Sequence, residues 1–140
     1  MRTRSKRHIY WGAIVLDTIK NLIITDRLDG NTMRVFLYLC YEMKTDDNIF
    51  YSKQIEIANK LTIHRSSVSK SIKKLIEKQY IKKIPEKGFM VNPNLFYVNK
   101  KSWRDREDLR EIFDKDISLP RFELDEEDGS LTVNDEDDTF

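Results

Sequence analysis

The residues with the clearest potential for chemistry lie along one side of the segment 65–78. Four apolar residues recur in this segment at helical spacing: Val68, Ile72, Leu75 and Ile76. The spacing predicts an amphipathic helix, whose other side carries only hydroxyls and cations: Arg65, Ser66, Ser69, Lys70 and Lys73. A solvated helix face usually mixes Glu with Lys, whereas here the only acid, Glu77, stands at the far end. This separation of charge favours contact with a polyanion over simple solvation.

The same residue types suit a helix that enters the major groove of duplex DNA. Short Ser side chains allow the helix to approach closely, and the Arg65 guanidinium can contact guanine O6 and N7 in a bidentate manner. The lysines suit phosphate contacts, and the first helical turn offers backbone N–H groups to a phosphate. The candidate DNA-binding residues in and next to this helix are therefore His64, Arg65, Ser66, Ser67, Ser69, Lys70, Lys73 and Lys74.

A second, shorter helix is predicted directly before this one. Ser52 has the character of an N-cap, and the helix is expected to run to about Lys60. Its inner face is predicted to consist of Ile55, Ala58 and Leu61. A tight turn at 62–64 then joins the two helices, which is the pattern of a helix-turn-helix.

A basic β-hairpin is predicted to follow the helix pair. Strands are expected at 80–84 and 90–91, with the turn at 85–88 between them. Its cations extend the candidate DNA-binding set by Lys82, Lys83 and Lys87. A helix-turn-helix followed by such a hairpin is a winged helix. The alternative is a hairpin that only closes the core through its apolar residues.

Further helices are expected on both sides of this unit. Apolar spacing predicts a helix over 13–24 and another over 32–44, which Asn31 or Thr32 would cap. Short strands are predicted at 49–51 and 95–98, and Ser102 begins a last helix over 102–115. The fold class expected is mainly α with a small β-hairpin: a winged helix-turn-helix domain with flanking helices.

The net charge of +1 conceals two strongly charged parts of the chain. Residues 1–104 contain 21 basic and 9 acidic residues, whereas residues 105–140 contain 4 basic and 15 acidic ones. This asymmetry is typical of a nucleic-acid-binding body with an acidic appendage. The domains expected are a basic N-terminal arm over 1–12, the winged-helix domain over 13–115 and a disordered acidic tail over 116–140.

Several other classes of protein find no support in the residues. Cys40 is the only cysteine and lies in an apolar run, so we expect a buried thiol in a reducing cytosol rather than a disulfide or zinc site. The two histidines, His8 and His64, do not form a metal-binding pair, and no phosphate-binding loop or catalytic triad is present. No stretch is apolar and long enough to span a membrane. We therefore expect a cytoplasmic protein that is not an enzyme and uses no metal or cofactor.

The run from Ile55 to Leu75 resembles the helix-turn-helix of winged-helix regulators. With Phe36 to Met43 before it and Gly88-Phe-Met-Val-Asn-Pro-Asn-Leu-Phe96 after it, the run is similar to RepL-type plasmid replication proteins of Firmicutes. The resemblance covers about residues 14–103. It implies binding to plasmid DNA and a role in plasmid replication or maintenance.

The function expected from these features is sequence-specific binding of double-stranded DNA in plasmid replication initiation or maintenance. One alternative is a transcriptional regulator that binds a promoter with the same fold. A second is a protein-interaction adaptor, in which the acidic tail holds a basic partner. The partners expected are duplex DNA, the replication machinery and a second copy of the chain, bound through the helices 13–24 and 102–115, with Trp103, Ile112 and Phe113 as the residues to test.

Overall fold

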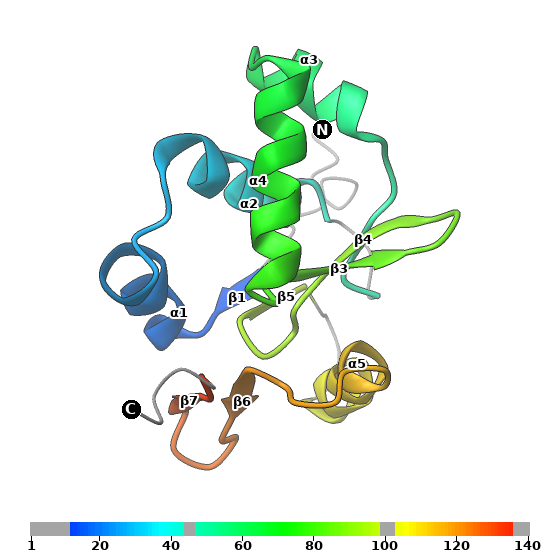
Figure 1. The fold of residues 1–140 in the computed structure, drawn as a ribbon. Coiled ribbons are helices and arrows are strands. Elements are labelled where there is room, and N and C mark those ends of the chain that lie inside the picture. Colours follow the sequence, from blue (N-terminus) through cyan, green and yellow to red (C-terminus); the bar gives the residue numbers. More distant parts are fainter. Residues whose placement is uncertain (1–11, 44–46, 99–102, 136–140) are drawn as a thin grey trace, which may run out of the picture.

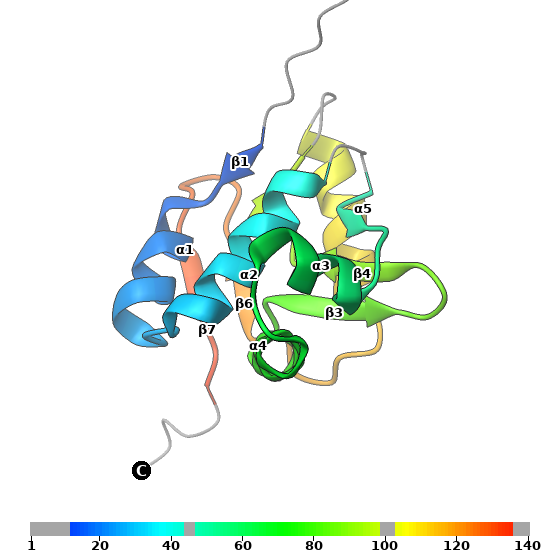
Figure 2. The ribbon, with the colours of Figure 1, turned by 90° about the horizontal axis from the view of Figure 1, so that it is seen from above.

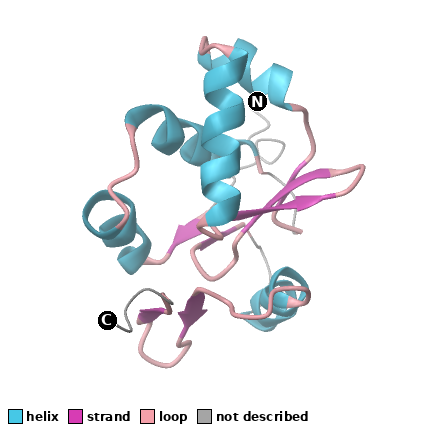
Figure 3. Ribbon diagram, viewed as in Figure 1, coloured by secondary structure: helices cyan, strands magenta, loops and turns pink. Residues whose placement is uncertain are grey.

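The computed structural model describes residues 12–43, 47–98 and 103–135. Its helical elements, in chain order, are α1 (Leu16–Lys20), η2 (Asn21–Thr25), α2 (Gly30–Glu42), α3 (Gln54–Leu61), α4 (Arg65–Glu77) and α5 (Trp103–Asp114). Its strands are β1 (Ala13–Ile14), β2 (Ile49–Phe50), β3 (Ile81–Ile84), β4 (Gly88–Val91), β5 (Phe96–Tyr97), β6 (Phe122–Leu124) and β7 (Leu131–Val133). Figure 3 shows several short strands beside the helices, so the fold is mixed rather than mainly α with one hairpin. Among the described residues, none of the helices combines the length and the apolar character needed to cross a membrane.

Every strand pair among the described residues is antiparallel. The largest sheet has the order β2-β4-β3, in which Ile49 pairs with Met90 and Lys83 pairs with Phe89. Two smaller sheets join β1 to β5 and β6 to β7. In Figure 1, the β3–β4 hairpin projects sideways beyond α4, and we call this hairpin the wing.

The main core lies between the helices and one face of the β2-β4-β3 sheet. Phe36 of α2, Leu75 of α4 and Ile81 of β3 are almost completely buried in it. A second, smaller core on the other face of the sheet joins Met90 to Leu109 and Phe113 of α5. Alternate residues of β3 and β4 therefore face the helix pair and α5, as the two-residue period of a strand requires.

The helix predicted over 13–24 begins later in the structure, at Leu16. Ala13 and Ile14 instead pair with β5, and the Val15 N–H donates to the Leu95 carbonyl at 2.9 Å. The helix begins only at Leu16 and continues as the π-helical η2. The apolar spacing of a segment cannot indicate that its first residues pair with a strand eighty residues away. The sequence therefore predicted a helix that begins at residue 13.

Two predicted helix caps were also wrong. The residue that caps α2 is Asp29, whose side chain accepts from the Thr32 N–H at 3.1 Å, and not Asn31 or Thr32. At α3 the N-cap position is held by Lys53, not Ser52, and no side-chain cap is formed among the described residues.

The inner faces of α3 and α4 differ from the prediction at two positions. Ile57 is completely buried with Ala58, whereas Ile55 is 38% exposed. Both Ile55 and Ile57 fit helical spacing, so the choice depends on how α3 packs against its neighbours. On α4, Ile76 is 37% exposed, and the polar Ser71 is buried instead, where it accepts a hydrogen bond from Thr32 Oγ1 at 3.2 Å.

The prediction of a disordered tail over 116–140 was wrong for most of that segment. Residues 122–124 and 131–133 form the β6–β7 hairpin, and Phe122 is 1% exposed and packs edge-on against the Tyr80 ring. Leu124 and Arg121 are buried as well. These few residues anchor the hairpin, although the average composition of the segment is strongly acidic. Residues 136–140 of the predicted tail and residues 1–11 of the predicted arm lie outside the described residues.

Candidate nucleic-acid interface

A sharp turn joins α3 to α4 and sets the angle between them. Thr62 adopts the left-handed conformation at φ 56° and ψ 47°, where such turns often carry Gly, and its N–H donates to the Ala58 carbonyl. The Ile63 N–H reaches the same carbonyl at 3.1 Å. Arg34 of α2 donates to the Leu61 carbonyl at 3.0 Å and so satisfies the end of α3. The turn predicted at 62–64 is confirmed.

The polar side of α4 faces outward, as the sequence predicted. The exposed residues on it and at its start are His64, Arg65, Ser66, Ser69, Lys70, Lys73 and Lys74, with Ser67 half-buried. In the view of Figure 2, α4 is seen end-on at the lower side of the molecule, with α2 and α3 above it. The opposite side holds Val68, Ile72 and Leu75 in the core.

The start of α4 has no side-chain cap among the described residues. His64 occupies the cap position, and its Nδ1 lies 3.2 Å from the Ser66 hydroxyl. A helix N-terminus without a capping side chain presents N–H groups and the positive end of the helix dipole to an anion. This end of α4 is thus suited to a phosphate.

Lys74 is held in place by an acid from another element. Its Nζ lies 3.0 Å from Asp29 Oδ1, at the N-cap of α2. The hydrogen bonds from Thr32 and then Lys74 outweigh partial burial and lower the pKa of Asp29 to about 2. Asp29 is therefore charged at neutral pH and offsets part of the Lys74 charge. Lys70 and Lys73 form no ion pair with another described residue, so they remain the stronger cationic positions of the face.

The three predicted cations of the wing do not lie on one surface. Lys83 and Lys87 are exposed. Lys82 points to the other face of the sheet, where its Nζ donates to the Phe113 carbonyl at 3.0 Å and lies 6.0 Å from the Phe113 ring centroid. Strand alternation separates Lys82 from Lys83, so Lys82 links the wing to α5.

A groove of about 470 Å³ runs between the start of α3 and the wing. Its cationic lining comes from Lys53, Lys83 and Lys87. The Ser52 hydroxyl, also in the lining, is buried and has no hydrogen-bond partner among the described residues. Glu56 and Glu86 stand in the same groove and reduce its positive charge. Sequence reasoning missed Lys53, because only the fold brings the start of α3 next to the wing.

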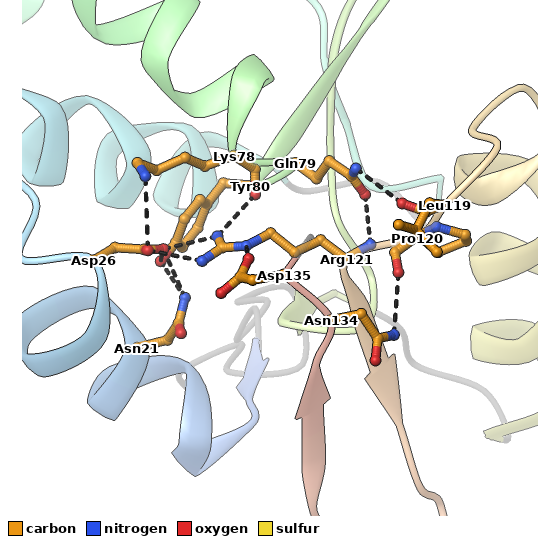
Figure 4. A network of polar contacts seen from close by, with 10 residues as sticks. All are labelled: Asn21, Asp26, Lys78, Gln79, Tyr80, Leu119, Pro120, Arg121, Asn134 and Asp135. Atoms are coloured by element: carbon orange, nitrogen blue, oxygen red, sulfur yellow. Dashed lines mark hydrogen bonds and ion pairs between the residues drawn. The ribbon is translucent and has the colours of Figure 1, made fainter. Parts of the chain in front are cut away.

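A buried polar network holds the other end of α4, and sequence reasoning missed it as well (Figure 4). At its centre, the Arg121 guanidinium donates to both oxygens of Asp26 at 2.7 and 2.8 Å, and also to the Lys78 carbonyl at 3.2 Å. Tyr80 and Asn21 donate to the same carboxylate at 2.7 and 2.9 Å. The network therefore ties the chain after α4 to the loop after η2 and to the C-terminal hairpin.

Metal and thiol chemistry are not indicated at this surface. Within the described ranges, no three His, Cys, Asp or Glu residues gather in a way that could hold a metal ion. Cys40 is buried as predicted, and burial raises the pKa of its thiol well above the usual range. The cations, hydroxyls and backbone N–H groups of the α4 surface are suited to binding an anion.

Comparison with known proteins identifies one family. The model of the Firmicute plasmid replication protein family (RepL) matches residues 12–118, which is about three quarters of the chain. It includes β1 to α5 and ends before the β6–β7 hairpin. No curated protein and no solved structure matches the chain. From the family match, this chain belongs to the RepL family of Firmicute plasmid replication proteins.

Proposed function

We propose that the α3–α4 pair and the wing form a winged helix-turn-helix that binds double-stranded DNA sequence-specifically in plasmid replication initiation or maintenance. The observation that carries the proposal is the outward face of α4, where cations and hydroxyls are concentrated without an acid until Glu77. The family membership supports a role in plasmid replication. The protein then acts in the cytoplasm, where plasmid DNA is replicated.

In this proposal α4 lies in the major groove with its N-terminal half against the base edges. Arg65 stands in the first turn and contacts a guanine, while Ser66 and Ser69 allow the helix backbone to approach. Lys70 and Lys73 contact phosphates on the sides of the groove. Lys74 contributes less, because Asp29 already holds its ammonium group.

The groove beside the wing takes the adjoining DNA backbone. Lys53, Lys83 and Lys87 converge on it from the start of α3 and from the wing. Lys82 is not part of this contact, since it is bound to α5. The bound protein marks a site for the replication machinery and does not itself catalyse a reaction.

The first experiment selects bound sequences from a random pool of duplex DNA at physiological salt and then measures affinity for the selected site. Arg65→Ala is expected to lower discrimination at one base position by about 1–3 kcal/mol. Lys73→Ala is expected to weaken binding to all sequences alike and to lower the slope of log K against log salt by about 0.9.

Neighbouring lysines of the wing provide the matched control. Lys83→Met is expected to weaken DNA binding, whereas Lys82→Met is expected to leave it unchanged, because Lys82 faces α5. An affinity that does not depend on salt, or an equal loss in both lysine variants, contradicts the proposed surface.

A further inference from the structure

The segment formed by α1 and η2 exposes a row of large aliphatic side chains, which we call the α1 ridge. The exposed fractions are 77% for Leu16, 42% for Ile19, 54% for Ile23 and 58% for Ile24. Helical spacing places these residues along one side. The other side is already used, because Thr18, Asn21 and Leu22 are buried against the body of the protein. The segment is thus apolar on the side that the described part of the fold leaves exposed.

The ridge has the size of the centre of a protein–protein interface. Four adjacent aliphatic residues at these exposures form a patch on the order of a few hundred Å², the range at which apolar surface marks an interaction site. A stable interface buries about 800 Å² on each partner, with an apolar centre and a polar rim. The ridge supplies the centre, and the exposed polar residues Lys20, Thr25 and Arg27 of the same stretch of chain supply part of the rim.

The charge of the segment favours a second copy of the chain as the partner. Residues 16–25 carry one acid, Asp17, and one base, Lys20, so two copies meet without net repulsion. Asp17 accepts a hydrogen bond from the Leu131 N–H at 3.1 Å, which directs its carboxylate toward β7. A nearly neutral aliphatic surface has no attraction for DNA. Because the same apolar patch can meet its own copy without charge repulsion, it suits a two-fold interface, in which each partner uses the same surface.

The position of the ridge is compatible with such a dimer on DNA. In both Figure 1 and Figure 2, α1 and the wing lie on opposite sides of α4. A partner docked at α1 therefore leaves α4 and the wing of each copy uncovered. We infer that the chain forms a two-fold dimer through the α1 ridge, and, given the proposed function, that the dimer binds two half-sites related by the same symmetry.

The other surface predicted for a dimer, the helix 102–115, is less suitable. Phe113 is completely buried in the second core and is not available to a partner. Ile112 is 55% exposed, but a single exposed apolar residue needs no partner. The side chain of Trp103 lies outside the described residues.

Sedimentation equilibrium of the full chain tests the inference without DNA. The wild type is expected at twice its mass of 16.8 kDa, and Ile23→Glu is expected at 16.8 kDa. Ile112→Glu is the matched control, since it places the same charge at an equally exposed isoleucine on α5, and it is expected to remain a dimer. Far-UV circular dichroism establishes that each variant is folded.

A second variant reports the geometry of the contact. Cys40 is buried, so an Ile23→Cys chain carries one reactive thiol, and mild oxidation is expected to link two copies, whereas Ile112→Cys is expected to stay unlinked. On DNA, Ile23→Glu is expected to keep its affinity for one half-site and to lose roughly 10²-fold on two. A monomeric wild type, or a dimer that Ile23→Glu leaves intact, overturns the inference. A wild type that does not bind even a single half-site would count against the proposed function, and not against the dimer.

Discussion

The contact between Arg121 and Asp26 offers the sharpest test of how the C-terminal hairpin is attached to the body. Both side chains are buried, with 10% and 5% of their surface exposed, and two hydrogen bonds of 2.7 and 2.8 Å join them. Arg121→Met keeps the aliphatic part of the side chain and removes the charge. The carboxylate of Asp26 then stays buried without its main partner.

The expected loss in the free energy of unfolding follows from this geometry. Removing one member of a buried ion pair costs about 3–5 kcal/mol, because the other charge is left uncompensated. Tyr80 and Asn21 still donate to Asp26, and Lys78 Nζ lies 3.8 Å from it, so we expect the lower end, about 3 kcal/mol. For a chain of this size that corresponds to roughly 10 °C in Tm.

The dependence on pH identifies the buried charge as the cause. Burial alone would raise the pKa of Asp26, but hydrogen bonds from Arg121 and Tyr80 outweigh it and hold this pKa below its usual value. In the wild type, the stabilisation by Asp26 is present above the unfolded-state pKa and is lost as the pH falls through the lowered one. Without Arg121, burial should raise the pKa of Asp26, so protonation relieves the variant. The difference in stability is therefore largest at pH 7 and shrinks in acid.

Urea unfolding followed by circular dichroism measures these quantities at neutral and acidic pH. The control is the double variant Asp26→Asn/Arg121→Met, which removes both charges and is expected to be more stable than Arg121→Met alone. A loss of less than about 1 kcal/mol in Arg121→Met, or a double variant that is no more stable, would refute the reasoning.

Two further substitutions test local features of the fold. Asp29→Ala removes the cap of α2 and is expected to lower the free energy of unfolding, measured in urea, by about 1 kcal/mol. Because the pKa of Asp29 is lowered to about 2, the stabilities of wild type and variant should converge as the pH falls toward that value. A constant difference down to pH 2 would contradict the role of Asp29 as the cap. Gly88→Val places a side chain against the Phe50 carbonyl at φ +153° and is expected to lower the free energy of unfolding, measured by thermal unfolding, by about 1–3 kcal/mol. The control is Gly30→Ala, which has open space where the Cβ would lie and should be nearly neutral. Equal effects in the two variants would show that the contact with Phe50 does not limit position 88.

Much of the helix pair could be predicted because its signals are local. The apolar spacing of Val68, Ile72 and Leu75 specified α4 to within a residue, and the same spacing placed its cationic side outward. The turn at 62–64 and the wing were predicted in the same way. In each case neighbouring residues carry enough information to choose the backbone conformation.

The errors occurred where distant segments meet. Whether Ile55 or Ile57 enters the core depends on the packing of α3, and helical spacing allows both. The predicted strand places Lys82 and Lys83 on opposite faces, but only the packing of the sheet decides which of them meets α5 and which stays exposed. The acidic composition of the C-terminal segment concealed Arg121 and Phe122, which anchor it to Asp26 and Tyr80.

The sequence by itself determined the helical elements around α4, the chemical character of its outward face and the absence of any second cysteine. Only the tertiary structure decided which charged residues share a surface, where the C-terminal hairpin attaches and which aliphatic residues stay exposed on α1. The physical reason is the range of the interactions. Helical periodicity is set within a few neighbouring residues, whereas burial and ion pairing depend on residues that are far apart in the chain and meet only after folding.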